Sequence, residues 1–287
     1  MAEQTNKTNP LAGYFRQAKF YTPLPSKSRY YPEGSIDWPA TGEVAIFPMT
    51  AKDEMAMRTP DALLNGQSTV EVIHSCCPAI QDPWEIPSID MDVLLISIRM
   101  ASYGHMMTVE PKCPKCSNSM AYELDLRDVI AKPLGAEWKD SAKINELEIG
   151  LRPLSYKQIN EKSLKTFEEQ KIISTLEAAE TDDMTAKMRR FNQSFKFLTG
   201  LTMETVIDQV EYIKLPDGTT VTDRSHIKEF VENADTAIYR GINAALQENK
   251  ERFDIPPMKV HCDNPECGNE FEQTLEFDAV NFFELNS

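Results

Sequence analysis

Apolar residues recur at helical spacing along much of the chain. Over Asp90–Ser102 they lie three and four residues apart, which places them on one face of a helix that Gly104 ends. Thr50 is a good N-cap, and Asp53 three residues later suits the positive end of a helix dipole. Comparable patterns predict helices over Thr59–Gly66, from Ser155 with Gln158 as a capping box to about Ala179, and over Asp183–Leu198, Asp223–Val231 and Asp235–Arg252.

Alternating apolar and polar positions predict several short strands. Glu148–Arg152 alternates like a strand, and Tyr212–Leu215 and Thr219–Val221 flank a Pro-Asp-Gly turn that favours a hairpin. Strand patterns also flank two cysteine pairs, over Met107–Val109, Ala121–Leu124, Met258–Val260 and Phe271–Leu275. The sequence therefore predicts an α+β fold: a mainly helical body with a small zinc-ribbon-like β element assembled from two distant knuckles.

The two cysteine pairs predict one metal site. Two residues separate Cys113 from Cys116, and four separate Cys262 from Cys267. Zinc binds thiolates strongly, and its structural sites are closed tetrahedra whose ligands come in such closely spaced pairs. Gly268 follows the last cysteine, where a knuckle needs a residue that tolerates positive φ. We expect one structural zinc ion bound by all four cysteines, because four thiolates leave no open position for catalysis.

Disulfides and free thiols are the alternatives to zinc. No apolar stretch suits a signal peptide or a membrane span, and Met1–Asn6 is polar. Without an export signal the chain is expected in reducing cytoplasm, where cysteine quartets more often hold metal than form disulfides. The compartment therefore favours zinc.

Four further residues have side chains of the types that can bind metal or undergo redox reactions. His105 and His261 lie near the knuckles in sequence and are interpreted as surface histidines, with a place beside the metal or as alternate ligands as the other interpretation. Cys76 and Cys77 follow an apolar segment, and adjacent cysteines do not easily form a normal disulfide. We predict that they are buried as small hydrophobes, with a redox role as the alternative.

Residues 1–42 differ in composition from the rest of the chain. Prolines block regular helix and disfavour central strands at positions Pro10, Pro23, Pro25, Pro32 and Pro39. Disordered tails are poor in aromatic residues, yet this segment contains Tyr14, Phe15, Phe20, Tyr21, Tyr30, Tyr31 and Trp38. We predict an extended N-terminal arm that packs either along its own domain or on a partner.

The remaining chain is divided at the knuckles. Residues 43–126 are predicted to form a helical region with the first knuckle, and residues 127–257 a helix-rich insert with a β-hairpin. Residues 258–287 hold the second knuckle and a C-terminal tail, in which Phe282 and Phe283 either cap the domain's own core or contribute to an exposed apolar surface.

The charge of the chain restricts its partners. Its 287 residues have a net charge of −15, although residues 1–58 carry slightly more basic than acidic side chains. Nucleic-acid-binding zinc ribbons are commonly basic, because neutralising phosphates supplies much of their affinity. We therefore expect no nucleic-acid binding. The sequence also lacks the motifs of phosphate loops, dinucleotide folds, metalloproteases and serine hydrolases, so we assign no catalytic residue and expect no enzyme.

Several segments, taken in order, resemble a known family. They are Arg16–Tyr21 with Leu24–Lys27, Tyr30–Pro32, Gly42–Glu54, Thr59–Gly66, and Asp92–Leu95 with Ala101–Gly104. This series is similar to the baseplate hub and hub-assembly proteins of T-even-type contractile-tailed bacteriophages. The specific likeness covers roughly residues 14–126, including the first knuckle, and the later region matches only in general pattern.

The resemblance implies a non-enzymatic structural or assembly role in a phage tail baseplate hub. Its expected partners are other baseplate and tail hub proteins, with self-association as a further option and no membrane span. The expected location is the host cytoplasm during assembly, with the virion baseplate as a second location. The rival hypothesis is a zinc-ribbon regulator that binds nucleic acid or transcription machinery, which would need a basic face.

Overall fold

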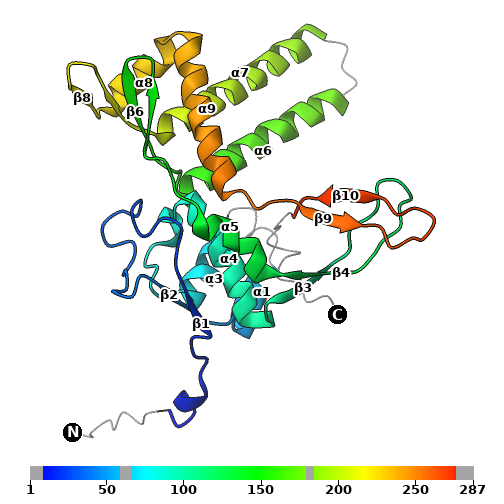
Figure 1. Cartoon of the computed structure of the whole chain (residues 1–287). Helices are drawn as coiled ribbons and strands as arrows, with labels where there is room; N and C mark the ends of the chain where they lie inside the picture. The colour runs from blue at the N-terminus through cyan, green and yellow to red at the C-terminus, as the bar shows by residue number, and fades with distance from the viewer. Residues whose placement is uncertain (1–8, 59–65, 179–183, 276–287) are drawn as a thin grey trace, which may run out of the picture.

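The computed structural model describes residues 9–58, 66–178 and 184–275, in which two lobes and two cysteine-bearing β-hairpins are seen (Figure 1). The first lobe, residues 16–135, is mainly helical. It and the segment leading into it contain η1 (Ala12–Tyr14), β1 (Phe20–Thr22), β2 (Val44–Ile46), α1 (Ala51–Met57), α3 (Gln67–Cys76), η2 (Pro83–Glu85), α4 (Ser88–Tyr103) and α5 (Leu126–Gly135). The hairpins are β3 (Met106–Val109) with β4 (Tyr122–Asp125), and β9 (Met258–His261) with β10 (Glu270–Gln273).

The second lobe, residues 138–253, packs helices on a four-stranded antiparallel sheet with strand order β5-β6-β7-β8. Gly150 in β6 passes so close to Tyr212 in β7 that an added Cβ would lie 2.2 Å from the tyrosine ring. The elements are β5 (Ser141–Ile144), β6 (Leu147–Leu151), α6 (Tyr156–Ala178), α7 (Met184–Gln209), β7 (Val210–Lys214), β8 (Thr220–Val221), α8 (Arg224–Asn233) and α9 (Thr236–Phe253).

Helix starts agree with the caps expected from sequence. The Thr50 and Asp53 side chains form a reciprocal capping box at α1. The Gln158 side chain accepts from the Ser155 backbone at 2.9 Å, and Asp223 caps α8 by accepting from two backbone N–H groups. Mixed helix and sheet content confirms the α+β class. The part of the chain described here includes no helix with the length and hydrophobicity needed to cross a membrane.

Several predicted elements differ from the structure. The helix predicted to end at Leu198 continues to Gln209, because Leu201, Val206 and Ile207 are buried beyond that point. The hairpin predicted at 212–221 belongs to a larger sheet, to which β5 was not assigned from sequence. Helices α3 and α5 were also missed. The helix predicted over 59–66 and the C-terminal aromatic residues lie outside the described residues, except for Gly66.

Residues 16–46 form an integral part of the first lobe. β1 and β2 form an antiparallel pair in which Tyr21 lies opposite Ala45. Leu24 is fully buried in the same core as Leu94 of α4. Of the two alternatives given for the predicted arm over 1–42, this part follows packing along its own domain. Its prolines keep the backbone irregular while its apolar side chains still fill the core.

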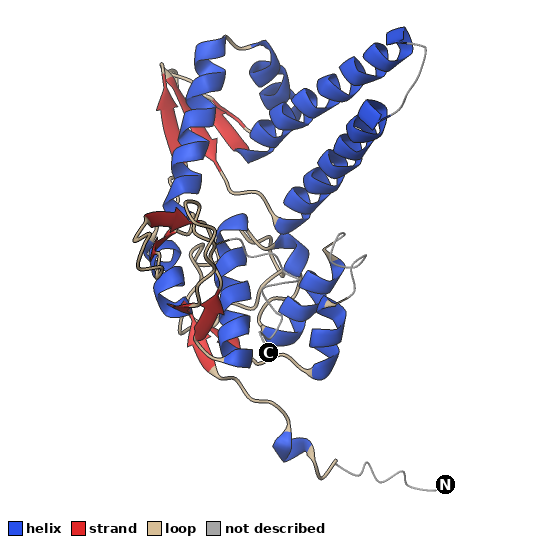
Figure 2. Ribbon diagram, turned by 90° about the vertical axis from the view of Figure 1, so that its right-hand side faces the viewer, coloured by secondary structure: helices blue, strands red, loops and turns tan. Residues whose placement is uncertain are grey.

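Arg16 marks the point where the N-terminal segment joins the lobe. Its guanidinium donates to the Pro48 carbonyl at 2.6 Å and the Ser75 carbonyl at 2.8 Å, and it forms an ion pair with Asp53 at 3.2 Å. Residues 9–15 carry no buried side chain and project away from the lobe (Figure 2). Arg16 thus separates a projecting segment from a packed one.

A buried carboxylate also anchors the N-terminal segment. Asp90, in the first turn of α4, has no exposed surface and accepts from the Ser26 backbone at 2.8 Å and the Ser26 hydroxyl at 2.5 Å. Burial raises the pKa of Asp90 to about 6, although the hydrogen bonds from Ser26 oppose this rise. The folded protein therefore binds a proton at Asp90 more tightly than the unfolded chain does.

Asp90→Asn is expected to alter the dependence of stability on pH. In the unfolded chain the pKa of an aspartate is about 3.9. Between about pH 4 and 6 the folded state therefore keeps the Asp90 proton and the unfolded chain loses it. The proton bound by Asp90 adds about 3 kcal/mol to the free energy of unfolding below this window. That stabilisation is lost as the pH rises through the window. Urea unfolding at several pH values should show the wild-type advantage over Asp90→Asn shrinking across the window. A difference that stays flat across this window would contradict the assignment.

The two lobes are tied together at the start of α6. Ser88 donates its backbone N–H to Leu154 at 2.8 Å, and Tyr156 donates to Ile86 at 2.8 Å. The Trp84 and Tyr156 rings stack with centroids 5.5 Å apart. From the second lobe, α9 then returns the chain to the first lobe and into β9 (Figure 1). This return brings the second cysteine pair beside the first.

Candidate metal centre

Each cysteine pair sits in the loop of a short antiparallel hairpin. β3 and β4 carry the first loop, and β9 and β10 carry the second. In the first loop the Cys113 backbone donates to the Asn118 carbonyl at 2.9 Å, and in the second the Cys262 backbone donates to the Asn269 carbonyl at 2.8 Å. These bonds close each loop in the same way.

The two loops share a local sequence pattern. Cys116 is followed by Ser117 and Asn118, and Cys267 by Gly268 and Asn269. Ser117 and Gly268 both have positive φ, at 59° and 51°. The expectation for Gly268 is confirmed. The matching role of Ser117 was not predicted, because serine rarely adopts this conformation without a structural reason.

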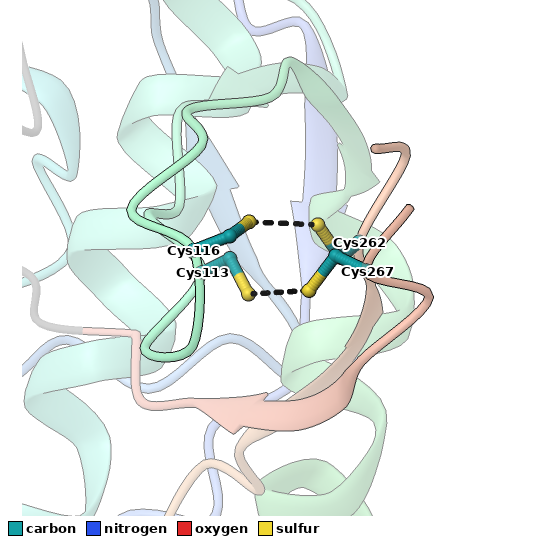
Figure 3. Close-up of side chains that lie close together, drawn as sticks. All are labelled: Cys113, Cys116, Cys262 and Cys267. Carbon is teal, nitrogen blue, oxygen red and sulfur yellow. Dashed lines mark hydrogen bonds between the residues drawn. The ribbon is translucent and has the colours of Figure 1, made fainter. Parts of the chain in front are cut away.

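The four sulfur atoms converge between the loops (Figure 3). All four lie within 4.8 Å of one another. The Cys113 and Cys267 sulfurs are 3.9 Å apart, and those of Cys116 and Cys262 are 3.6 Å apart. Each close pair thus joins one loop to the other.

This geometry fits a tetrahedral metal ion. Four sulfurs at the usual zinc distance of about 2.3 Å would lie about 3.8 Å from one another. The observed separations bracket that value and are much longer than a disulfide bond of about 2.05 Å. All four cysteines are free thiols in the structure. The cluster can therefore hold one metal ion with a complete four-thiolate shell.

Asparagine side chains link the two loops around the sulfurs. Asn118 donates to Asp263 of the opposite loop at 2.5 Å, and Asn269 lies 3.8 Å from the Cys113 sulfur as a donor. Neither residue is predicted from the sequence. Their shared position two residues after the last cysteine of each pair is the signal that would have found them.

Local N–H groups favour the thiolate form of Cys113. Burial raises the pKa of this thiol, but backbone N–H groups of Cys116 and Lys115, with the neighbouring thiols, outweigh it and lower the pKa to about 6. The thiolate is the form that binds metal. Against the backbone hydrogen bonds that they receive, burial and the neighbouring thiols raise the pKa of Cys262 and Cys267, so these thiols titrate together and Cys113 ionises first.

A small apolar core supports the site. Met120, Met258 and Val260 are buried together with Cys113 and Cys262, and Phe271 packs partly against them. Its buried residues form their own cluster, which meets the first-lobe core only through the partly buried Leu124 and Leu275 among the described residues. A bound metal would therefore supply much of the cohesion of the hairpin pair.

The other cysteines and the nearby histidines do not join the cluster. His105 and His261 are exposed, and neither contributes an atom to the four-cysteine group. Cys76 and Cys77 are fully buried in the first-lobe core. Burial raises the pKa of each of these thiols to about 12, so both stay protonated. Their interpretation as small buried hydrophobes is consistent with this environment.

Comparison with known proteins identifies one family. The family model described as T4 bacteriophage base plate protein matches residues 31–284. The match spans both cysteine pairs and both lobes. Searches of curated proteins and of solved structures found no matching relative.

Proposed function

Because the chain belongs to the T4 bacteriophage base plate protein family, we propose that it is a non-enzymatic component of the baseplate hub, structural or acting in assembly, and stabilised by zinc. The family match over residues 31–284 is the observation that carries this proposal. Its role is to make protein–protein contacts with other baseplate and tail hub proteins. It acts in the host cytoplasm during assembly, and a resident component would also be present in the tail baseplate of the virion.

Zinc is the metal that best suits the four-cysteine cluster. Cys113, Cys116, Cys262 and Cys267 would hold it, and four thiolates fill its tetrahedral shell. The ion supplies cohesion between two hairpins far apart in sequence, and its closed shell leaves no position for a substrate. This chemistry supports a structural site and agrees with the lack of catalytic motifs.

Baseplate assembly in phage with this gene inactivated tests the proposed function. We expect such phage to produce few complete baseplates, and complementation with the intact gene to restore them. Mass spectrometry of purified tails then separates a resident component, present at fixed stoichiometry, from an assembly factor that departs. Normal baseplates formed without the chain would contradict the proposal.

The rival hypothesis of a nucleic-acid-binding regulator is tested by the salt dependence of DNA binding. Phosphate contacts produce affinities that fall steeply with salt. We expect the purified chain to bind DNA weakly at physiological salt, because four exposed carboxylates surround its second hairpin: Asp263, Glu266, Glu270 and Glu272.

A further inference from the structure

Helices α6 and α7 form an antiparallel hairpin that projects from the second lobe (Figures 1 and 2). Their 23 and 26 residues correspond to lengths of about 35 and 39 Å. The inner end of α7 is held in the lobe by buried Leu201, Val206 and Ile207. The outer end extends beyond the other elements of the lobe.

The outer half of this hairpin has almost no core of its own. Among residues 164–176 and 185–200, Ser194 is the only described residue that is buried. Phe167 and Phe195 are each 52% exposed, and Met188 is 58% exposed. Partly or fully exposed apolar residues are Leu164, Phe167, Ile172, Ile173, Leu176, Met188, Phe191, Phe195, Phe197 and Leu198. Helices gain stability mainly by burying an apolar face, so this density of uncovered apolar residues indicates a docking surface.

The apolar residues of α7 form a stripe suited to another helix. Met188, Phe191, Phe195 and Leu198 are spaced three or four residues apart, and the Phe191 and Phe195 ring centroids are 5.2 Å apart. A shallow surface groove of about 460 Å³ lies on the outer part of α7, and Thr185, Met188, Arg189 and Asn192 line it. Side chains of a third helix could enter such a groove, as in helix-in-groove recognition.

The charge around the stripe defines the partner. Between Met184 and Met203 the chain has four basic residues and no acidic one, although its net charge is −15. The basic residues are Lys187, Arg189, Arg190 and Lys196. Arg189 and Lys196 form no ion pair within the described residues. A partner with carboxylates flanking an apolar face would complement this surface.

We propose that the outer half of the α6–α7 hairpin docks an acidic amphipathic helix of another tail protein. This inference rests on the proposed role in the baseplate and specifies one contact surface for it. A second copy of the hairpin is a poorer occupant, because it would bring two basic α7 segments together. Nucleic acid is also a poorer occupant, because its phosphates would leave the exposed apolar side chains of the stripe, such as Met188 and Phe195, partly uncovered.

A designed peptide pair tests the docking surface on the intact, zinc-loaded chain. The first probe is a fluorescent peptide of about 20 residues, roughly 30 Å as a helix, with leucines on one face and glutamates on the other. The second replaces each glutamate with lysine. We expect only the acidic peptide to bind, and Phe167→Ser/Phe195→Ser and Arg189→Glu/Arg190→Glu each to weaken its affinity at least about tenfold. Tyr14→Ser and Lys143→Glu, which change exposed residues elsewhere, should leave the affinity unchanged.

Three results with the peptides would overturn the proposal. They are failure of the acidic peptide to bind, equal binding of both peptides, and hairpin variants that bind the acidic peptide as tightly as the wild-type chain does. Self-association in analytical ultracentrifugation that Phe167→Ser/Phe195→Ser abolishes would assign the surface to a second copy. Binding of duplex DNA that Arg189→Glu/Arg190→Glu abolishes would assign it to nucleic acid. If these results occur while the chain is still needed for complete baseplates, the proposed function stands and only the docking surface is lost.

Discussion

Cys116→Ser is expected to remove bound zinc and to lower the melting temperature substantially. The sulfurs of Cys116 and Cys262 are 3.6 Å apart although the two residues lie 146 positions apart in sequence. The serine hydroxyl is a poor zinc ligand, so the ion would keep only three thiolates and lose its complete tetrahedral shell. Structural zinc sites contribute several kcal/mol or more to folding, so a loss of about 4 kcal/mol would lower the melting temperature by about 10 °C. Zinc content by plasma emission spectroscopy and thermal unfolding by circular dichroism check both expectations.

A second cysteine variant serves as the control. Cys76→Ala removes a buried thiol from the first-lobe core and should lower stability without changing zinc content. Comparison of the two variants separates loss of the metal from general destabilisation. Retention of the full zinc content by Cys116→Ser would contradict the four-cysteine assignment.

Removal of residues 1–42 is expected to unfold the first lobe. The deletion removes β1, which pairs with β2, and it removes Leu24 from the core. It also removes Ser26, which leaves the buried Asp90 carboxylate without its two donors. Losing a buried leucine costs about 2–5 kcal/mol, and leaving a buried polar group unsatisfied adds about 1–3 kcal/mol. Together with the lost strand pairing, this approaches the total stability of a typical domain, about 5–15 kcal/mol.

A shorter deletion provides the matched control. Removal of residues 1–15 takes away η1, which contains no buried residue, and leaves Arg16 in place. Circular dichroism and hydrogen exchange should show native-like helix content and protection in this variant. If the protein lacking residues 1–42 unfolded cooperatively at nearly the melting temperature of the full-length protein, this segment would be dispensable for the fold.

Local chemistry accounts for the parts of the fold that could be predicted. Thr50, Ser155 and Asp223 cap helices through hydrogen bonds to residues two or three positions away, so the sequence contains the whole interaction. The cysteine spacing and Gly268 are local in the same sense. The convergence of the two distant pairs could be inferred only because a single metal needs four ligands.

Long-range packing explains the elements that were missed. The N-terminal segment joins the core through buried Leu24, and the Ser26 hydroxyl donates to Asp90 of α4, 64 positions away in sequence. β5 has only four residues, two polar and two apolar, and its pairing with β6 gives it strand structure. Such tertiary contacts override local propensity. Asn118 and Asn269 were missed for another reason, since only a comparison of the two knuckles makes their shared position visible.

X-ray absorption spectroscopy at the zinc edge tests most directly whether one zinc ion bound by four cysteines joins the two hairpins. The purified, metal-loaded protein is predicted to bind one zinc ion with four sulfur neighbours at about 2.3 Å. This shell follows from the convergence of Cys113, Cys116, Cys262 and Cys267 within 4.8 Å. Absence of bound zinc, or a shell that contains nitrogen or oxygen in place of sulfur, would contradict the account.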